Sequence, residues 1–280
     1  MAGLEELMPA DRLAAEALRA KGALVDAVVW TNSSVVWSDY DAVVIRSPWD
    51  YHLQPRQFLV WLETLERSGT RVFNPLSILR WNLDKHYLLD LKARNIQIPR
   101  TMFIEPGDSL DVERVREIFS DEEIVVKPAI SASAWETRRI RLSDLSSEDL
   151  DWMSGLRPQN CLILQEYMPE VRTEGEWSFI FFGTAFSHAV VKQPAGEDFR
   201  VQEEWGGTSM LERPSLRHIE SAREIIRTIH EPLLYARVDA VVRNGELYLM
   251  ELELVEPALY FDAMPPSADA FCERFDAIFQ

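Results

Sequence analysis

The segment 236–254 constrains the fold more than any other part of the chain. It reads ARVDAVVRNGELYLMELEL, two apolar runs joined by Asn244-Gly245. An Asn-Gly pair between alternating apolar residues predicts a β-hairpin, because both residues tolerate the positive φ that tight hairpin turns require. Residues 177–191, WSFIFFGTAFSHAVV, predict a second hairpin that turns at Gly183-Thr184. The second half of the chain is therefore expected to contain an antiparallel sheet.

The first half alternates between short apolar runs and helical patterns, which predicts a parallel sheet with helices on its faces. Asp11 is the expected N-cap of the first helix, and glycines 22 and 69 end the first two helices. A polar loop is expected at 193–211, and loops of this length are usually functional or disordered. The predicted strands are 23–30, 42–46, 71–73, 101–104, 124–127 and 161–168, and the predicted helices are 11–22, 55–68, 84–94, 110–120, 215–230 and 267–279.

Charge and composition exclude several classes of protein. The 280 residues contain 29 Lys and Arg against 46 Asp and Glu, a formal charge of −17, so the average field repels nucleic acid. An anionic ligand must then be held by a local cluster of cations. The chain has no apolar run of about 18 residues, the length that a membrane span needs. Cys161 and Cys272 form neither a disulfide framework nor a CxxC pair, which favours a reducing, cytoplasmic location.

The chain also lacks the common motifs of phosphate loops, dinucleotide sites, zinc proteases and serine hydrolases. It contains no GxxxxGK[ST], GxGxxG, HExxH or GxSxG segment, and its five histidines do not stand at metal-ligand spacing. The remaining candidates for chemistry are acids and lysines near the ends of predicted strands.

Three of these acids lie on the hairpin at 236–254. Glu251 and Glu253 point to one face because side chains alternate along a strand, and adjacent carboxylates on a half-buried strand are tolerated when a hard cation lies between them. The alternative, that both simply face water, stays open from the hairpin alone. A two-residue turn would put Asp239 on the opposite face. We therefore expect a three-residue loop at 243–245, with positive φ at Gly245, which places all three acids on one face.

Two lysines stand where a phosphate group could lie. Lys127 closes the apolar run IVVKP, so its ammonium is aimed at the sheet edge where ligands of α/β proteins collect. Lys85 stands at the start of a helix, where an ordinary surface lysine is the other interpretation. Neither lysine is specific when taken alone.

In combination, the motifs resemble the ATP-grasp superfamily, in its glutathione synthetase-like branch. Within that branch, RSPWDYH at 46–52 and ELELVEPALYF at 251–261 are most similar to the ligases that form D-cycloserine. The similarity follows the order of the chain: RSPWD at 46–50, FNP at 73–75 with SILR at 77–80 and Lys85, IVVKP at 124–128, LQEYMP at 164–169 with Glu176, a loop with Lys192, Arg200, Gln202 and Gly206-Gly207, and the acids Asp239, Glu251 and Glu253.

The resemblance implies an α/β fold in three parts: a small N-terminal parallel-sheet domain (1–77) and two α+β subdomains (78–164 and 165–280) that enclose ATP. It implies an amino-acid-like small-molecule substrate near Arg46, Ser47 and Asp50, although a structural ion pair is the other interpretation of Arg46. It implies ATP contacts from Lys85, Lys127, Ser131, Ser133, Gln165, Glu166, Tyr167, Met168 and Glu176, Mg²⁺ on Asp239, Glu251 and Glu253, and catalytic roles for Lys127, Lys192, Arg200 and Gln202.

The implied activity is ATP-dependent ligation of a carboxylate or carbonyl carbon to an amine through a phosphorylated intermediate, with ADP and phosphate released. The ligation could join two molecules or close a ring, as in antibiotic biosynthesis. Two other classes stay open: a nucleotide-binding ATP-grasp protein without ligase activity, and an acidic interaction module that binds no nucleotide. A monomer and a homo-oligomer are both compatible with the sequence.

Three features depart from that branch. The loop at 129–134 reads AISASA where most relatives have several glycines, and this favours the alternative without ligase activity. In place of the backbone groups that glycines would expose, Ser131 and Ser133 are expected to offer hydroxyls to phosphate. Glu253 stands where relatives commonly have Asn, and the added charge favours two Mg²⁺ ions over one. Relatives begin with a strand, whereas 1–9 is a poor strand, so either the sheet lacks that edge or the start lies upstream.

Overall fold

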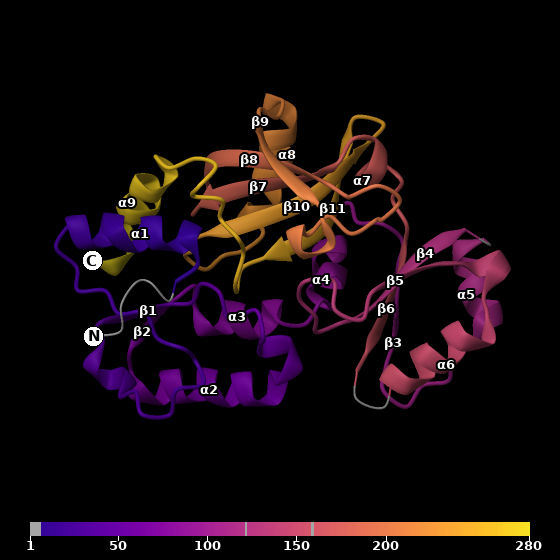
Figure 1. Ribbon diagram of the computed structural model, residues 1–280, viewed down its shortest axis with the longest axis horizontal. Coiled ribbons are helices and arrows are strands. Elements are labelled where there is room, and N and C mark those ends of the chain that lie inside the picture. Colours follow the sequence, from indigo (N-terminus) through magenta and orange to yellow (C-terminus); the bar gives the residue numbers. More distant parts are fainter. Residues whose placement is uncertain (1–6, 121, 158–159) are drawn as a thin grey trace.

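The computed structural model describes residues 7–120, 122–157 and 160–280, and its elements form three groups (Figure 1). A five-stranded sheet occupies the upper part of the view, a four-stranded sheet with two helices lies at the right, and a group with a short parallel strand pair lies at the lower left. This arrangement confirms the predicted α/β fold with a small N-terminal parallel sheet and two α+β parts. No helix among the described residues is long and apolar enough to cross a membrane. The expectation about a first strand falls mainly on residues 1–6, which lie outside the described ranges.

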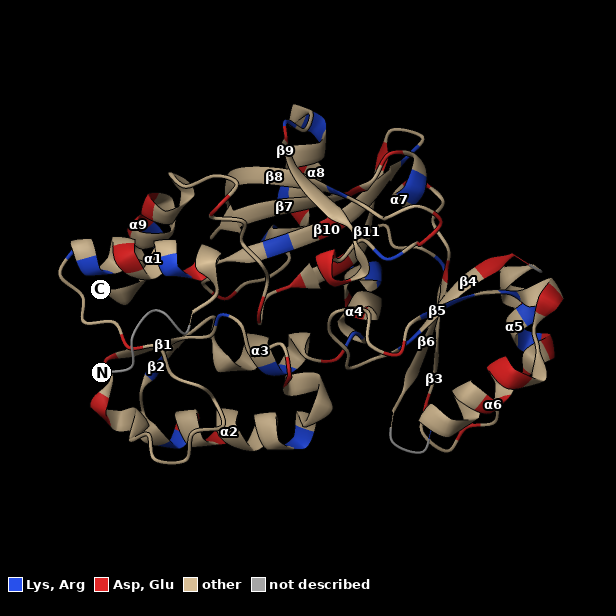
Figure 2. Ribbon diagram, viewed as in Figure 1, with Lys and Arg blue, Asp and Glu red and all other residues tan. Residues whose placement is uncertain are grey.

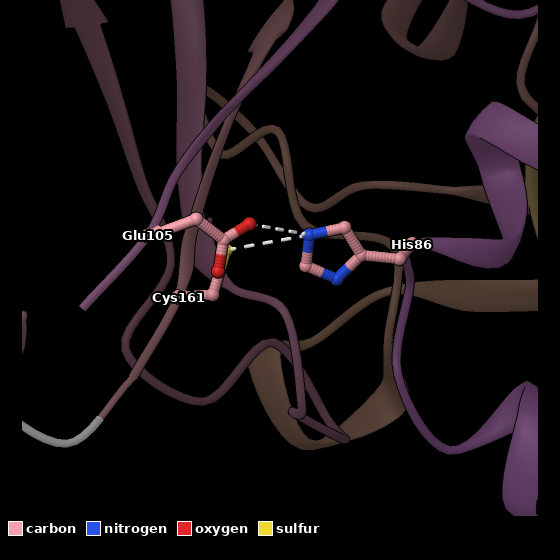
Figure 3. A group of neighbouring side chains, drawn as sticks. All are labelled: His86, Glu105 and Cys161. Atoms are coloured by element: carbon pink, nitrogen blue, oxygen red, sulfur yellow. Dashed lines mark hydrogen bonds and ion pairs between the residues drawn. The ribbon is translucent and has the colours of Figure 1, made fainter. Parts of the chain in front are cut away.

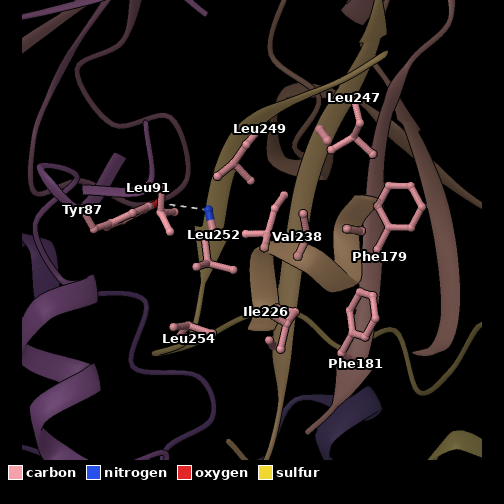
Figure 4. Packing of buried hydrophobic residues seen from close by; sticks show 14 of the residues in the cluster. Tyr87, Leu91, Phe179, Phe181, Ile226, Val238, Leu247, Leu249, Leu252 and Leu254 are labelled. Atoms are coloured by element: carbon pink, nitrogen blue, oxygen red, sulfur yellow. Dashed lines mark hydrogen bonds between the residues drawn. The ribbon is translucent and has the colours of Figure 1, made fainter. Parts of the chain in front are cut away.

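The five-stranded sheet has the order β11-β10-β7-β8-β9 and is antiparallel throughout. Helices α4 (Tyr87–Ala93) and α8 (Leu216–Arg227) cover one face, where Val238 and Leu252 are buried among their apolar side chains (Figure 4). Because strand side chains alternate, the residues next to Val238 and Leu252 face the other side of the sheet. The strands are β7 (Glu176–Phe182), β8 (Ala185–Gln193), β9 (Thr208–Glu212), β10 (Ala236–Arg243) and β11 (Glu246–Glu253).

The turn between β10 and β11 differs from the prediction. Arg243 pairs with Glu246, so the loop has two residues rather than three. Both Asn244 (φ 54°) and Gly245 (φ 77°) have positive φ, as the common two-residue hairpin turn requires. The predicted loop length is therefore wrong, and the predicted positive φ at Gly245 is confirmed.

A β-bulge in β11 restores the register that the turn length alone would break. Asp239 pairs directly with Glu251, and Met250 is the extra residue. Since Glu253 lies two residues beyond Glu251, the three carboxylates share one face of the sheet.

The four-stranded sheet has the order β3-β6-β4-β5, and α5 and α6 cover one of its faces. Asp111 caps α5 by accepting a hydrogen bond from the Arg114 N–H, and Ser146 forms a capping box with Asp149 at the start of α6. The sequence patterns predict neither β5 nor α6. The elements are β3 (Thr101–Ile104), α5 (Val112–Phe119), β4 (Glu123–Pro128), β5 (Arg138–Arg141), α6 (Ser147–Leu156) and β6 (Leu162–Glu166).

The N-terminal group contains the parallel pair β1 (Ala42–Val44) and β2 (Arg71–Phe73), with α2 (Pro55–Ser68) and α3 (Leu76–Asn82) beside it. The predicted strand at 23–30 is wrong, because that segment pairs with no described strand, and its Leu24 is 98% exposed. Helix α3 is absent from the sequence-based prediction, which begins a single helix at residue 84.

Helices α1 (Pro9–Ala20) and α9 (Ser267–Phe279) lie against each other. The predicted N-cap role of Asp11 is wrong: the helix begins at Pro9, with Met8 in the cap position, and Asp11 lies in its first turn. Asp11 is buried, and its carboxylate binds Arg46 and Ser47.

Two buried asparagines fix the end of β11 to the N-terminal group. Asn74 donates a hydrogen bond to the Leu254 C=O at 2.8 Å. Asn82 donates to the Leu252 C=O at 2.8 Å and accepts from the Leu254 N–H at 2.7 Å. The backbone on both sides of Glu253 is thus held in place.

The segment 193–211 is not a loop throughout. Strand β9 pairs with β8 along the sheet edge, so only residues 194–207 of the predicted loop lie between strands. Within that part, Glu203–Trp205 forms the 3₁₀ helix η5. The other short elements are η2 (Trp37–Asp39), η3 (Tyr51–Leu53), η4 (Leu142–Asp144) and α7 (Glu170–Thr173).

Candidate active site

A cavity of about 580 Å³ lies between the five-stranded and four-stranded sheets. It is lined by every residue that the sequence assigns to ATP, metal or catalysis, whereas Arg46, Ser47 and Asp50 are not among its lining residues. Charged residues of both signs are spread over all three groups of elements (Figure 2). The cavity is therefore distinguished by its buried cations, not by the overall charge of the region around it. The predicted residues that line it are Lys85, Lys127, Ser131, Ser133, Gln165, Glu166, Tyr167, Met168, Glu176, Lys192, Arg200, Gln202, Asp239, Glu251 and Glu253.

One wall of the cavity carries the three hairpin carboxylates. Arg237 bridges two of them: its Nε lies 2.9 Å from Asp239 Oδ1, and its Nη2 binds Glu253. Ser178 Oγ donates to Asp239 Oδ1 at 2.6 Å. The sequence-based prediction omits Arg237, although its position two residues before Asp239 on one strand puts both on the same face.

The protonation of these acids is perturbed. Burial raises the pKa of Glu253 to about 8, although Arg237 opposes the shift. Burial likewise raises the pKa of Glu256, a further lining residue, to about 7. For Asp239, Arg237 and Lys192 outweigh the effect of burial and lower the pKa. Crowded, partly buried carboxylate oxygens of this kind are the donor set that a hard divalent cation prefers.

Three lysines face the acids. Lys192 Nζ lies 2.6 Å from Glu176 Oε1 and 3.0 Å from Asp239 Oδ2, and although burial acts against it, these carboxylates raise the lysine pKa. Lys85 Nζ lies 3.0 Å from Glu251 Oε1 and donates to a backbone carbonyl at 2.7 Å.

Lys127 differs from the other two lysines. Its ammonium makes no hydrogen bond or close ion pair with any residue that the structure describes, yet it lines the cavity. Burial lowers its pKa, and the positive charge of Lys85 acts in the same direction. A half-buried cation without a close partner is stabilised by an anion, so the cavity is suited to a negatively charged ligand next to Lys127.

The glycine-free loop after β4 adopts backbone conformations that glycine usually supplies. Ser133 (φ 50°) and Ala134 (φ 54°) both have positive φ. Each such residue costs about 1–2 kcal/mol relative to glycine, and strain of this kind persists where surrounding contacts enforce it. Ser131 is buried, and its hydroxyl donates to the Pro128 C=O at 3.0 Å.

The segment after β6 offers unpaired backbone groups beside an apolar wall. Neither the Met168 N–H nor the Tyr167 C=O is hydrogen-bonded to a residue within the described ranges. Met168, Val171 and Val201 form a small apolar cluster at this place. The Glu166 side chain is held by other partners, with its carboxylate 2.6 Å from Arg243 Nη1 and 3.1 Å from Arg100 Nε.

The irregular segment after β8 closes over the glycine-free loop. Trp205 Nε1 donates to the Ser133 C=O at 3.2 Å, and the Arg200 guanidinium lies 3.4 Å from the centre of the Trp205 ring. Arg200 is also paired with Asp198 at 2.7 Å. A Cβ atom at Gly207 would lie 2.2 Å from the Val201 C=O oxygen, so only glycine allows this tight return of the chain.

The predicted substrate residues of the N-terminal group have structural partners. Arg46 Nε lies 2.9 Å from Asp11 Oδ1, which agrees with the alternative of a structural ion pair, and Trp30 Nε1 donates to Asp50 Oδ1 at 2.8 Å. The residues that line the cavity on this side are not among the predicted site residues. Trp49, Glu256 and Tyr260 belong to the motifs at 46–52 and 251–261, whereas Met8, Pro9, Ala10, Asp11 and Asp262 belong to none.

Comparison with known proteins assigns the family. A family model for the N-terminal domain of D-cycloserine synthetase DcsG matches residues 1–74. The cycloserine biosynthesis protein DcsG of Streptomyces lavendulae is 30% identical over 264 residues, which cover 87% of this chain and 85% of that protein. The chain belongs to the DcsG family.

Solved structures agree with this assignment. The crystal structure of D-cycloserine synthetase DcsG is similar to this DcsG-family chain with a TM-score of 0.86 and 27% identity, and the match covers 96% of this chain and 94% of that one. D-alanine–D-alanine ligase from Bacillus anthracis shares the fold with a TM-score of 0.69 at 14% identity, over 100% of this chain and 95% of that one. The predicted resemblance to ATP-grasp ligases, and to the D-cycloserine-forming ones among them, is confirmed.

Proposed function

We propose that this DcsG-family ligase uses ATP and Mg²⁺ to phosphorylate a carboxylate or carbonyl oxygen of an amino-acid-like small molecule, and then forms a C–N bond with an amine. The observation that carries the proposal is the unpartnered Lys127 ammonium opposite three crowded carboxylates in one cavity. An anion would pair with Lys127, and a cation would pair with the carboxylates on the opposite wall of the cavity. A nucleoside triphosphate with its magnesium supplies both charges.

Different residues of the cavity are suited to the adenine, the ribose and the phosphates of ATP. The unpaired backbone groups of Tyr167 and Met168 are suited to the adenine edge, with an apolar wall behind the ring, and Gln165 and Glu166 complete this end. Glu176 is assigned to the ribose hydroxyls. We assign the phosphates to Lys85 and Lys127, with Ser131 and Ser133 on the loop beside them.

Asp239, Glu251 and Glu253 fit magnesium, because they present oxygen ligands on one face and because burial already disfavours the charge of Glu253. Magnesium bound there neutralises charge on the phosphates. The extra carboxylate at Glu253 supports two ions rather than one. Lys85, Lys192 and Arg237 balance these carboxylates within the protein.

In the proposed reaction a substrate oxygen attacks the γ-phosphorus of ATP, and the bond from that phosphorus to the β-phosphate oxygen breaks to leave ADP. An amine then attacks the activated carbon, the C–N bond forms, and phosphate departs with the electrons of the C–O bond. The protein has no need of a covalent nucleophile. Its contributions are charge neutralisation by Lys127 and Lys192, contacts from Arg200 and Gln202 on the closing segment, and exclusion of water, which would hydrolyse an acyl phosphate.

The relative from Streptomyces is named for cycloserine biosynthesis, and we propose the same type of reaction here, in which one molecule closes on itself. The substrate end of the cavity is then its N-terminal side, beside Arg46, Ser47 and Asp50. The division into 1–77, 78–164 and 165–280 remains our proposal for the domains, with β6 crossing the second boundary. A cytoplasmic location and the lack of a nucleic-acid partner are predictions of the same standing, and both a monomer and a homo-oligomer are compatible with the proposal.

Phosphate release in the presence of ATP and Mg²⁺ tests the proposal, with amino acids, dipeptides and O-ureidoserine as candidate substrates. We expect release that depends on one candidate and matches a C–N product by mass spectrometry; ring closure needs no added amine. Heat stabilisation by ATP without turnover of any candidate would instead favour a nucleotide-binding protein without ligase activity. No heat stabilisation by ATP would contradict both.

A further inference from the structure

A second cluster of metal-ligating side chains lies outside the cavity. His86, Glu105 and Cys161 converge from the start of α4, the end of β3 and the start of β6 (Figure 3). One ligand atom from each lies within 4.8 Å of the others. No sequence motif predicts this cluster, because its members are brought together only by the fold.

The spacing is close to that of a zinc site. His86 Nε2 lies 2.9 Å from Glu105 Oε1 and 3.8 Å from Cys161 Sγ. A tetrahedral zinc ion with its usual bond lengths places such nitrogen and oxygen ligands about 3.3 Å apart, and nitrogen and sulfur about 3.6 Å apart. Shifts of a few tenths of an ångström, within reach of these partly or fully exposed side chains, convert one geometry into the other.

The imidazole is oriented for ligation. Asp84 Oδ1 lies 2.6 Å from His86 Nδ1 and also accepts a hydrogen bond from the His86 backbone N–H at 3.0 Å. A carboxylate on one ring nitrogen fixes the tautomer that leaves the other nitrogen free for a metal, and this arrangement is usual behind metal-bound histidines. The ring also stacks on Phe103, with 4.1 Å between ring centres.

The His86 imidazole has a carboxylate within hydrogen-bond distance of each ring nitrogen, Asp84 at Nδ1 and Glu105 at Nε2. A positive charge must therefore lie among these groups. That charge is either a proton on Nε2 or a metal ion between Nε2, Glu105 and Cys161. The nearby Cys161 favours the metal ion, because its thiol adds only a weak hydrogen bond to the proton-mediated pair, whereas its thiolate is a preferred ligand of zinc.

We propose that His86 Nε2, the Glu105 carboxylate and the Cys161 sulfur form a binding site for a zinc-class divalent cation, with Asp84 as the positioning residue. Binding displaces the thiol proton and the Nε2 proton to solvent, so the ion is held by a thiolate, a neutral imidazole and a carboxylate. Burial raises the pKa of the Cys161 thiol to about 12, which makes the ion a requirement for the thiolate form at neutral pH.

The site adjoins the proposed nucleotide site without sharing residues with it. Lys85 precedes His86 in the chain, and its backbone N–H donates to the Ala129 C=O at 3.1 Å. The Ala129 N–H in turn donates to the Cys161 C=O at 2.8 Å. A metal ion there ties the start of α4 to the base of the loop that carries Ser131 and Ser133.

Cobalt and zinc test the site independently of ligase activity. Metal-free full-length protein is titrated with Co²⁺ while Mg²⁺ and ATP saturate the carboxylates of the cavity. We expect one equivalent to give a near-ultraviolet thiolate-to-cobalt band with strong visible bands of tetrahedral cobalt, and Zn²⁺ to bleach them. Cys161→Ser abolishes the thiolate band, and Cys272→Ser, at the only other cysteine, leaves it unchanged.

The remaining variants test the other ligands and the positioning residue. His86→Gln, Glu105→Gln and Asp84→Asn are each expected to weaken cobalt binding about tenfold or more, while circular dichroism and the melting temperature of the metal-free protein report that the fold is retained. A hydrogen-bonded ion-pair cluster without metal affinity is the competing outcome. It is established if wild-type protein gives no thiolate band, or if the His86 and Glu105 variants bind cobalt as tightly as wild type.

Discussion

Lys127 is the residue on which the proposed chemistry depends most directly. Lys127→Ala removes a charge-assisted contact to phosphate in a desolvated cavity, and we expect ATP turnover to fall by about 100-fold or more. Phosphate release measures turnover, and heat stabilisation by ATP measures nucleotide binding, which should weaken in parallel. Lys92→Ala, on the exposed side of α4, is the matched control. Normal phosphate release by Lys127→Ala would end the assignment.

Glu176 is proposed to act on binding rather than on the chemical step. Contacts to the ribose are alike in the ground and transition states, so Glu176→Gln should raise the KM for ATP about tenfold and leave kcat near its original value. Initial rates over a range of ATP concentrations separate the two constants. Because Glu176 also pairs with Lys192, a large fall of kcat at saturating ATP would place it in the chemistry instead.

At the scale of elements, two glycines should respond oppositely to the same substitution. Gly245 has φ 77° in the β10–β11 turn, and Gly245→Ala should destabilise the protein by about 1–2 kcal/mol. Gly155 lies within α6 with open space around it, and Gly155→Ala should stabilise by about 0.5–1 kcal/mol. Thermal unfolding gives both signs. Two shifts in the same direction would contradict the conformations assigned to these residues.

Elements with local signals are predicted well from the sequence. Helix α9 has the predicted limits 267–279, and α2 ends before Gly69, because helical periodicity and end residues are properties of the segment itself. The run at 23–30 has a strand-like composition but pairs with no strand in the described part of the chain, and pairing is a non-local property. Strand β9 escapes prediction for the converse reason: its residues are polar or exposed, and only the edge of β8 makes it a strand.

The bulge at Met250 leaves a trace in the sequence, but the trace is missed when buried and exposed residues are assumed to alternate strictly along the strand. Leu247 and Leu249 are buried on one face, and so is Leu252, which stands at the wrong parity for a regular strand. A single extra residue reconciles the two sets. The motif residues of the cavity were predictable by resemblance, whereas Arg237 and the cluster around His86 depend on contacts that no motif encodes.

For the whole molecule, the buried acids make stability depend on pH. The pKa of Glu253 is raised to about 8 and that of Glu256 to about 7, so above pH 6.5 the folded state holds protons that the unfolded state has lost. Stability of the metal-free protein should therefore fall as the pH rises from 6.5 to 8, by at most about 1.4 kcal/mol per pH unit for each group. Denaturant unfolding at several pH values measures this slope.

Substitution of single residues shows which carboxyl group causes the dependence of stability on pH. Glu253→Gln cannot lose a proton and should flatten the dependence, whereas Glu246→Gln, at the exposed end of the same hairpin, should leave it unchanged. The pH range of the measurement begins at 6.5 because of His188, whose burial lowers its pKa to about 4. Below pH 6.5 this histidine makes stability rise with pH, which is the opposite of the effect of the two acids. Equal slopes in wild type and Glu253→Gln would contradict the raised pKa.

The packing of α1 against α9 sets the order in which the protein can be completed on the ribosome. Lys21 and Asp276 form an ion pair across 255 positions of sequence, and Ala14 is buried beside Phe271. At ordinary rates of translation, about 13 to 50 seconds pass between the synthesis of these partners. During that time the apolar side of α1 is not covered by α9, and the part of the cavity wall that contains Asp11 lacks the packing of the finished protein. Chains that stop before α9 therefore lack the surface that covers the apolar side of α1.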